Sequence, residues 1–213
     1  PLTPDFQLQP EKILEAADAH SKILFICSPN NPSGNAVKRE DILFLLENFP
    51  GIVVVDEAYI DFSSEPSLIH ELDQYPNLLV MQTFSKAWGL ASLRLGIAFA
   101  SHELIAILNQ IKPPYNISGL TQETVLAALP NKGKVDELIR KIKEERTFLK
   151  QELEKLPDVL KIHPSDANFL LVQVPDANRF YDGLIEEKVI VRNRSTVLHC
   201  EGCLRITVGT RDE

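Results

Sequence analysis

The sequence predicts an α/β protein, with a mostly parallel sheet in its first part and a smaller α+β region at its carboxyl end. Two observations lead to this class. Up to about residue 130, short apolar runs alternate with amphipathic segments of helical spacing, which is typical of βαβ units around a parallel sheet. A long, charged amphipathic segment then leads to several short strand candidates.

Three apolar runs in the first part have the composition of buried strands. They lie at 52–55, 78–81 and 95–99. A helix is predicted over 37–48, because apolar side chains recur along one side of that segment at helical spacing. A later helix should end before Pro113, which lacks a backbone donor and restricts Lys112. The segment 113–117 that follows is either a loop at the mouth of a site or a plain connector.

The second part opens with a helix predicted over 136–156. Four strands and one helix are expected after it. The strands are predicted at 160–162, 169–174, 189–191 and 204–208, with the helix at 178–187. We therefore expect two domains: residues 1–133 as the C-terminal part of a large domain, and residues 134–213 as a bridging helix and a small C-terminal domain.

Composition and charge exclude several classes of function. With 213 residues, of which 44% are hydrophobic, the chain is long enough to bury a core. A net charge of -8 argues against nucleic acid as a partner. No apolar run approaches the roughly 18 residues of a membrane-spanning helix, so no membrane partner is expected.

The cysteines predict neither a disulfide framework nor a metal centre. Cys200 and Cys203 have the C-x-x-C spacing of redox and zinc motifs, but the sequence contains only one such pair. A structural zinc site needs four ligands, and His199 is poorly placed to be a third. We expect no metal, and a reduced pair in the turn before the last strand.

The most informative residues are Lys86 and Asp56. Asp56 directly follows the run at 52–55, so its carboxylate should emerge at the carboxyl edge of the sheet, where open α/β sheets bind ligands. A lysine amine can form a Schiff base with an aldehyde cofactor, and a carboxylate can keep a pyridine nitrogen protonated. The pair therefore predicts a site for pyridoxal 5'-phosphate.

The other requirements of that cofactor are met by residues nearby in the sequence. Thr83, Ser85 and Arg94 offer two hydroxyls and a guanidinium for the phosphate. Tyr59 and Asn31 offer donors for the phenolic oxygen of the ring. Each of these residues alone is ordinary, as a loop carboxylate or a polar turn residue, but chance is a poor explanation for all of them in this order.

At this point the chain resembles the fold-type I, class-II pyridoxal-phosphate-dependent aminotransferases, and within them the histidinol-phosphate branch. The resemblance runs from end to end and is carried by SPNNPSG at 28–34, VVVDEAYIDF at 53–62, TFSKAWGLASLRLG at 83–96, PPYNIS at 113–118, DANFLLV at 166–172 and CLRITVGTRDE at 203–213. It implies that Lys86 is the internal-aldimine lysine and proton shuttle, with Asp56 and Tyr59 also catalytic.

The same resemblance implies the substrates and the cellular setting. The reaction would convert histidinol phosphate and 2-oxoglutarate to imidazole acetol phosphate and glutamate, in histidine biosynthesis. Arg205 would bind the substrate carboxylate or phosphate, Arg192 would be the second phosphate ligand, and Asn31 would contact the substrate as well as the cofactor. A cytoplasmic homodimer would be expected.

The resemblance also implies a longer chain, of which these residues are the carboxyl-terminal portion. Family members begin with a small-residue turn for the cofactor phosphate and an aromatic ring that stacks on the pyridine, and neither feature occurs here. Three alternatives therefore stay open: a related aromatic aminotransferase, an amino-acid-phosphate decarboxylase, or a non-catalytic fragment that serves as an interaction or regulatory module.

Overall fold

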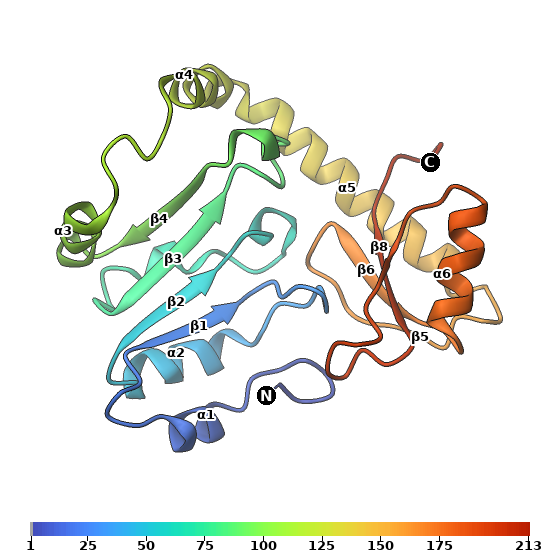
Figure 1. Cartoon of the computed structure of the whole chain (residues 1–213), viewed down its shortest axis with the longest axis horizontal. Helices are drawn as coiled ribbons and strands as arrows, with labels where there is room; N and C mark the ends of the chain where they lie inside the picture. The colour runs from blue at the N-terminus through green and yellow to red at the C-terminus, as the bar shows by residue number, and fades with distance from the viewer. Residues whose placement is uncertain (1) are drawn as a thin grey trace.

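In the computed structural model, which describes residues 2–213, the chain forms two four-stranded sheets (Figure 1). The strands are β1 Ile23–Cys27, β2 Ile52–Asp56, β3 Leu78–Thr83, β4 Gly96–Ala100, β5 Lys161–Ile162, β6 Phe169–Gln173, β7 Arg192–Asn193 and β8 Cys203–Thr207. The α-helices are α1 Pro10–Ala16, α2 Arg39–Asn48, α3 His102–Ile111, α4 Gly119–Ala128, α5 Lys132–Leu153 and α6 Ala177–Glu186. Short 3-10 helices lie at Ile60–Phe62, Leu68–Glu71, Ala91–Leu93 and Leu129–Asn131.

The first sheet has the order β1-β2-β3-β4, and its first three strands are parallel. Its register aligns Cys27, Asp56 and Met81, so these residues lie together at the carboxyl edge. The predicted α/β class with a mostly parallel sheet is confirmed. β4 runs antiparallel to β3, because the loop between them contains no crossover helix to return the chain to the other end of the sheet.

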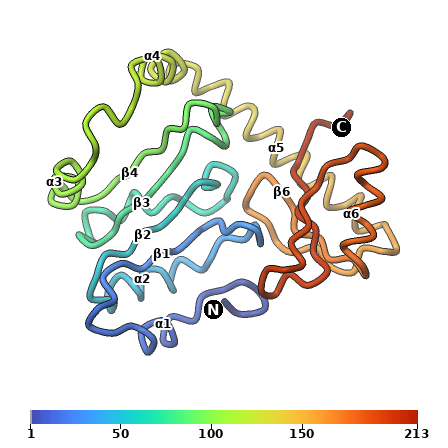
Figure 2. Tube along the Cα trace, in the orientation of Figure 1, coloured from blue at the N-terminus to red at the C-terminus, as the bar shows by residue number. Residues whose placement is uncertain are grey.

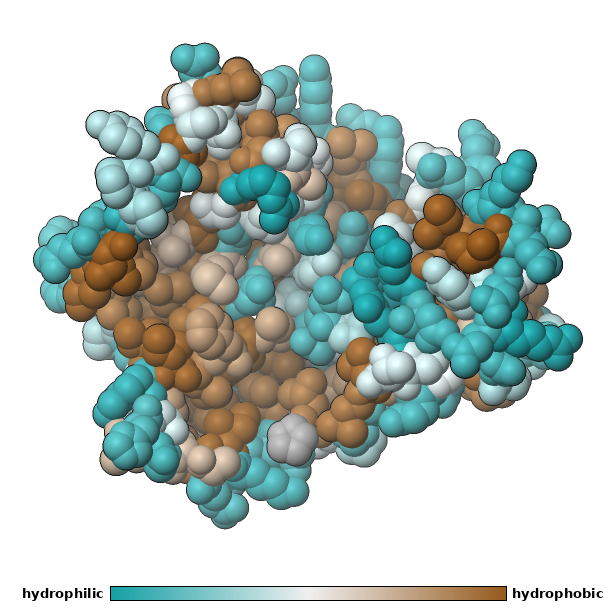
Figure 3. Space-filling model, in the orientation of Figure 1, coloured by the Kyte–Doolittle hydropathy of each residue, from teal (hydrophilic) through white to brown (hydrophobic). Residues whose placement is uncertain are grey.

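One face of the first sheet is buried and the other is open. α1 and α2 cover the buried face, where Leu45, Val53 and Val80 are completely inaccessible. On the opposite face, Ile23 is 52% exposed and Phe25 is 66% exposed. Figure 3 shows hydrophobic side chains exposed over this sheet. This side of the sheet is therefore apolar and uncovered. We call the surface that includes Ile23 and Phe25 the bare apolar face.

The second sheet has the order β5-β6-β8-β7 and is antiparallel throughout. α5 and α6 pack on one face, around Leu170, Val172 and Leu204. The amino-terminal segment lies against the other face (Figure 2), where Phe6 and Leu171 belong to one buried cluster. This second face is directed toward the loop that follows β1, so it takes part in the site described below.

The structure corrects the predicted strand at 189–191. The chain turns there at the end of α6, because Lys188 adopts a left-handed φ of 63° and Val189 donates its amide to Leu184 at 2.8 Å. Ile190 is 73% exposed. The edge strand forms only afterwards, as β7. The break before Pro113 is confirmed, since α3 ends at Ile111.

None of the helices in residues 2–213 is both long and apolar enough to cross a membrane.

Candidate active site

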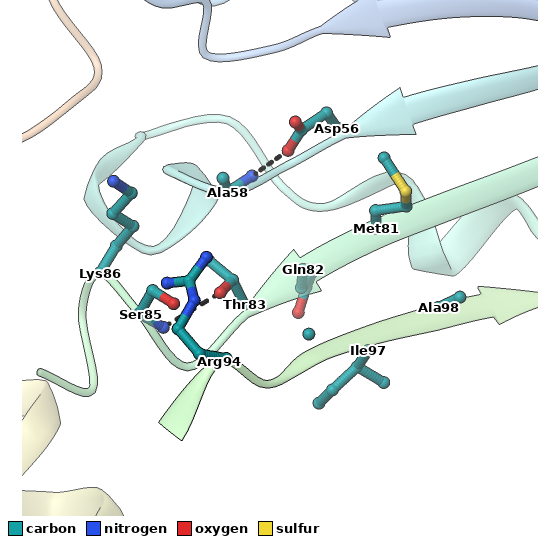
Figure 4. A pocket seen from close by; sticks show the side chains of 11 residues that line it. Asp56, Ala58, Met81, Gln82, Thr83, Ser85, Lys86, Arg94, Ile97 and Ala98 are labelled. Carbon is teal, nitrogen blue, oxygen red and sulfur yellow. Dashed lines mark hydrogen bonds between the residues drawn. The ribbon is translucent and has the colours of Figure 1, made fainter. Parts of the chain in front are cut away.

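A cavity of about 490 Å³ opens at the carboxyl edge of the first sheet. It lies where β2 and β3 end and where β4 begins, because the antiparallel direction of β4 brings its amino end to that edge. The residues that line it are Asp56, Ala58, Met81, Gln82, Thr83, Ser85, Lys86, Arg94, Gly96, Ile97 and Ala98 (Figure 4). Five of the seven residues predicted to bind the cofactor are therefore gathered around one cavity.

Lys86 and Asp56 line this same cavity. Asp56 is half-buried at the end of β2, and its Oδ1 accepts a hydrogen bond from the Ala58 amide at 3.0 Å. That bond fixes the carboxylate and leaves its other oxygen free for a ligand. Lys86 is exposed, with its Nζ 5.0 Å from the centroid of the Tyr59 ring. An amine and a carboxylate therefore reach one space from two different elements.

Thr83, Ser85 and Arg94 lie together in Figure 4, where β3 ends and β4 begins. The Thr83 hydroxyl donates to the Leu95 carbonyl at 3.2 Å and accepts from the Ser85 amide at 3.0 Å. Because its single donor is used in this way, Thr83 shapes the turn. The Ser85 hydroxyl and the guanidinium of Arg94 are the donors left for an anion.

Arg94 is held in a restricted backbone conformation. It closes the 3-10 helix Ala91–Leu93 with a φ of 52°, in the left-handed region that non-glycine residues rarely adopt. Its Nη1 donates to the Ala91 carbonyl at 3.1 Å, so one edge of the guanidinium is anchored to the chain. The remaining donors can face an anion in the cavity.

Tyr59 does not line the cavity but lies between it and the second sheet. Its ring is buried and packs edge-on against Phe169, with the centroids 5.3 Å apart. The guanidinium of Arg205 lies 5.0 Å from the centroid of the same Phe169 ring. The amine of Lys86, the tyrosine, the phenylalanine and the arginine are thus in contact one after another.

Arg205 and Asn31 contact each other across the two sheets. Arg205 Nη1 donates to Asn31 Oδ1 at 2.7 Å, although the residues are 174 positions apart. Asn31 does not line the cavity but a separate pocket, together with Leu198 and His199. Its amide nitrogen has no hydrogen-bond partner in residues 2–213.

Arg192 is exposed and pairs directly with Arg205 in the register of β7 and β8. Burial lowers the pKa of the Arg205 guanidinium, the positive charges of Arg194 and Arg192 lower it further, and Tyr59 opposes the shift. The positive charges of Arg192 and Arg194 therefore act on Arg205 from the same part of the second sheet.

Two further residues join the second sheet to the loops around the cavity. Arg146, from α5, donates to the Phe62 carbonyl at 3.2 Å and to the Ala167 carbonyl at 2.7 Å. Asp166 accepts from the Ala36 amide at 3.2 Å. The sequence carried a signal for the first of these residues, because Arg146 interrupts the apolar stripe of α5 at helical spacing.

The cavity's donor set suits an anionic aldehyde cofactor. It offers one amine, one carboxylate across from it, and hydroxyl and guanidinium donors for a phosphate. Nowhere in the described part of the chain do three or more His, Cys, Asp or Glu side chains gather as metal ligands would. Cys200 and Cys203 are free and buried.

Comparisons with known proteins agree on one family. The model of the family described as "Aminotransferase class I and II" matches residues 1–213. A histidinol-phosphate aminotransferase of Cytophaga hutchinsonii is 55% identical over 213 residues, which are 100% of this chain and 61% of that protein. The chain therefore spans less than two thirds of the length of that curated relative.

Solved structures show the same fold. The histidinol-phosphate aminotransferase of Clostridium acetobutylicum superposes with a TM-score of 0.90 at 22% identity, over 99% of this chain and 66% of that one. The enzyme from Sinorhizobium meliloti, solved in complex with pyridoxal-5'-phosphate, has a TM-score of 0.85 at 23% identity, over 99% of this chain and 59% of that one. The predicted fold type is thereby confirmed.

Proposed function

The chain belongs to the class I and II aminotransferase family, and on this premise we propose that the full-length protein is a histidinol-phosphate aminotransferase that uses pyridoxal 5'-phosphate. It exchanges an amino group between histidinol phosphate and 2-oxoglutarate, giving imidazole acetol phosphate and glutamate. The observation that carries the proposal is the cavity shared by Lys86, Asp56 and Arg94. The 55% identity to a curated enzyme of that name supports the choice of substrate.

The residues of the cavity have distinct roles in this proposal. When bound, the cofactor supplies an aldehyde that accepts the amino group and a pyridine ring that takes up electron density. Lys86 Nζ is the group that would hold the cofactor at its aldehyde carbon and would move the proton at the substrate carbon that bears nitrogen. The carboxylate of Asp56 keeps the ring nitrogen protonated, because an adjacent negative charge favours the charged form.

Anions are held at two places. Ser85 and Arg94 grip the cofactor phosphate, and Thr83 orders the turn that presents them. Arg205 and Arg192 bind the phosphate of histidinol phosphate or, in its place, a carboxylate of glutamate. Tyr59 and Asn31 donate to the phenolic oxygen of the cofactor, and Asn31 also meets the substrate through its contact with Arg205.

We propose further that the full-length protein is a cytoplasmic homodimer in which residues 1–133 and 134–213 belong to different domains. Free cysteines in the described part of the chain support a reducing compartment. Large exposed side chains around α3 and α4, among them Ile111 and Leu120, offer apolar surface for a partner copy. The two separate sheets support the division into domains. Light scattering of the full-length protein tests the dimer.

Turnover of the full-length protein tests the proposed reaction. Purified enzyme is supplied with the cofactor and 2-oxoglutarate, and kcat/KM is compared for histidinol phosphate, phenylalanine and threonine phosphate. A clear preference for histidinol phosphate is the expected result. A preference for phenylalanine would identify an aromatic aminotransferase, and release of CO2 from threonine phosphate would identify a decarboxylase.

A titration of the 213-residue chain with pyridoxal 5'-phosphate asks whether these residues hold the cofactor by themselves. We expect a saturable absorbance change that Lys86→Ala removes, because the lysine amine is the attachment point. A chain that shows no saturable change at any cofactor concentration would support a non-catalytic module.

A further inference from the structure

Three arginines extend from one face of the second sheet. Arg192 lies opposite Arg205 in the register of β7 and β8. The backbone amide of Arg194 donates to the Cys203 carbonyl at 2.8 Å, so Arg194 continues the same ladder by one more pair. Because side chains two positions apart in a strand share a face, Arg194 lies on the face of Arg192 and Arg205. This face is directed toward Asn31.

This arginine cluster has no negative partner within the chain. In the part of the chain that the structure describes, no carboxylate lies within ion-pairing distance of Arg192, Arg194 or Arg205. The Nε atoms of Arg194 and Arg205 are both buried and contact no acceptor. A buried N–H donor without an acceptor is costly, so these two Nε atoms are the unsatisfied part of otherwise accessible guanidinium groups. Within the described residues, the donors of this cluster are therefore available to an anion.

Arg194 is the member of the cluster that the proposed reaction has not used. Its positive charge lowers the pKa of the Arg205 guanidinium more strongly than that of Arg192 does, after the larger effect of burial. The two charges therefore interact, although Arg194 lies just after β7 and Arg205 lies in β8. A ligand that neutralises Arg205 would be stabilised by Arg194 as well.

We propose that Arg194 is a third phosphate ligand and makes the site selective for a phosphate ester over a carboxylate. The inference rests on the proposed function, in which Arg192 and Arg205 receive either group. A carboxylate has two oxygens and one negative charge, which two arginines can satisfy. A phosphate monoester has three free oxygens and close to two negative charges at neutral pH. A third guanidinium group therefore adds hydrogen bonds that a carboxylate cannot accept.

The test separates the two half-reactions of the full-length enzyme. Arg194→Gln removes the charge, and Arg194→Lys keeps the charge without the planar fork. Arg179→Gln is the matched control, because Arg179 is exposed on α6 and makes no ion pair in the described residues. Single-turnover kinetics are measured with histidinol phosphate and, separately, with glutamate. Binding of inorganic phosphate to each protein is measured by calorimetry.

For Arg194→Gln we expect KM for histidinol phosphate to rise about tenfold, as for the loss of one charged hydrogen bond, with kcat nearly unchanged. Inorganic phosphate should bind about tenfold more weakly. The glutamate half-reaction should change by less than about twofold, and Arg194→Lys should recover part of the loss. Arg179→Gln should behave as wild type.

Unchanged kinetics and unchanged phosphate binding in Arg194→Gln would overturn the inference. Equal losses in both half-reactions would also overturn it, because they would mean that Arg194 only supports the geometry of Arg205. If the wild-type enzyme does not turn over histidinol phosphate but Arg194→Gln still weakens phosphate binding, the proposed function fails and the phosphate ligand stands.

Discussion

The guanidinium of Arg205 donates a 2.7 Å hydrogen bond to the side-chain oxygen of Asn31. This contact joins the last strand of the second sheet to the loop after β1, and it occupies one of the donors that an anionic substrate would use. Because the partner is a neutral amide, Arg205 keeps its full positive charge. The relationship positions the arginine without neutralising it.

An Asn31→Asp substitution should separate positioning from charge. The new carboxylate would pair with Arg205, so the full-length protein should be as stable as wild type or up to about 1 kcal/mol more stable. It would also compete with the substrate anion, so KM for the phosphate substrate should rise about tenfold. Urea unfolding and steady-state kinetics measure the two effects. If KM stays at the wild-type value, the contact does not form part of the binding site.

Replacing Lys86 should abolish chemistry without unfolding the protein. The side chain is exposed and makes no hydrogen bond in residues 2–213, so Lys86→Ala should change the unfolding free energy by less than about 0.5 kcal/mol. Borohydride reduction followed by mass spectrometry should find the cofactor on the wild-type peptide only. Lys86→Arg, which keeps the charge, should also fail to attach it. An Ala variant that turned over at the wild-type rate would exclude this lysine from the reaction.

Removing Arg146 should destabilise the protein. Its guanidinium satisfies the carbonyls of Phe62 and Ala167, and a methionine of similar length would leave both without a partner. We expect Arg146→Met to lose about 1–3 kcal/mol of unfolding free energy. Lys141→Met on the exposed side of α5 is the control, since its ion pair with Glu137 is largely exposed. Equal urea midpoints for the two variants would contradict the assigned role.

The cysteines should differ sharply in reactivity. Cys27 is exposed, whereas Cys200 and Cys203 are buried, so Cys27 differs from them in access to a reagent; its pKa is also raised, by partial burial of the thiol and by the charge of Asp56. Burial, more than the neighbouring Cys200 and Glu201, raises the pKa of the Cys203 thiol from an ordinary value of 9.0 to about 11. At pH 8 a thiol reagent should therefore modify Cys27 first and reach the other two only on unfolding. Counting modified thiols by mass spectrometry in native and denaturing buffer checks this order.

The same thiol gives the stability of the fold a pH dependence. Because the pKa of Cys203 is higher in the folded chain than in the unfolded chain, the folded state binds more protons above pH 9. Its contribution is fully present below about pH 9 and is lost as the pH rises through about 11. Cys203→Ala should flatten that part of a urea-midpoint profile against pH. A profile identical to wild type would show that the thiol does not contribute.

Two neighbouring residues of β1 test the open face of the first sheet. Ile26 is 3% exposed and packs against α2, whereas Phe25 points to the bare apolar face. Ile26→Ala should cost about 2–4 kcal/mol of unfolding free energy. Phe25→Ala should cost under about 1 kcal/mol and reduce binding of a hydrophobic dye. Denaturant unfolding of the 213-residue chain compares them, and similar losses would contradict the assignment of the two faces.

Much of the first sheet could be predicted from local sequence, because short apolar runs between polar segments are typical of buried parallel strands, and the run at 52–55 consists of β-branched residues. The position of Asp56 at the carboxyl edge followed from where its run ends. β1 was missed although residues 23–27 form an uninterrupted apolar run like those of the other strands, and the direction of β4 depends on the length and content of a loop.

The contacts of the second sheet were harder to predict because they depend on distant residues. The run at 189–191 has strand composition, yet the end of α6 takes priority over that preference. The bond between Arg205 and Asn31 joins residues 174 positions apart, and no local pattern encodes it. Arg194 was overlooked for the same reason. Its proposed role depends on its position beside Arg205 of β8 and on the lack of an ion pair between Arg194 and any carboxylate of the described residues.

The antiparallel direction of β4 has a consequence for motion. Lys86 and Arg94 both lie on the loop that joins β3 to β4, and these two strands are paired. A rigid movement of the second sheet would therefore leave the separation of Lys86 and Arg94 unchanged. Such a movement alters instead the reach from Arg205 to the amine. The contacts that join the two sheets, such as the bond from Arg205 to Asn31, are therefore what fix that reach.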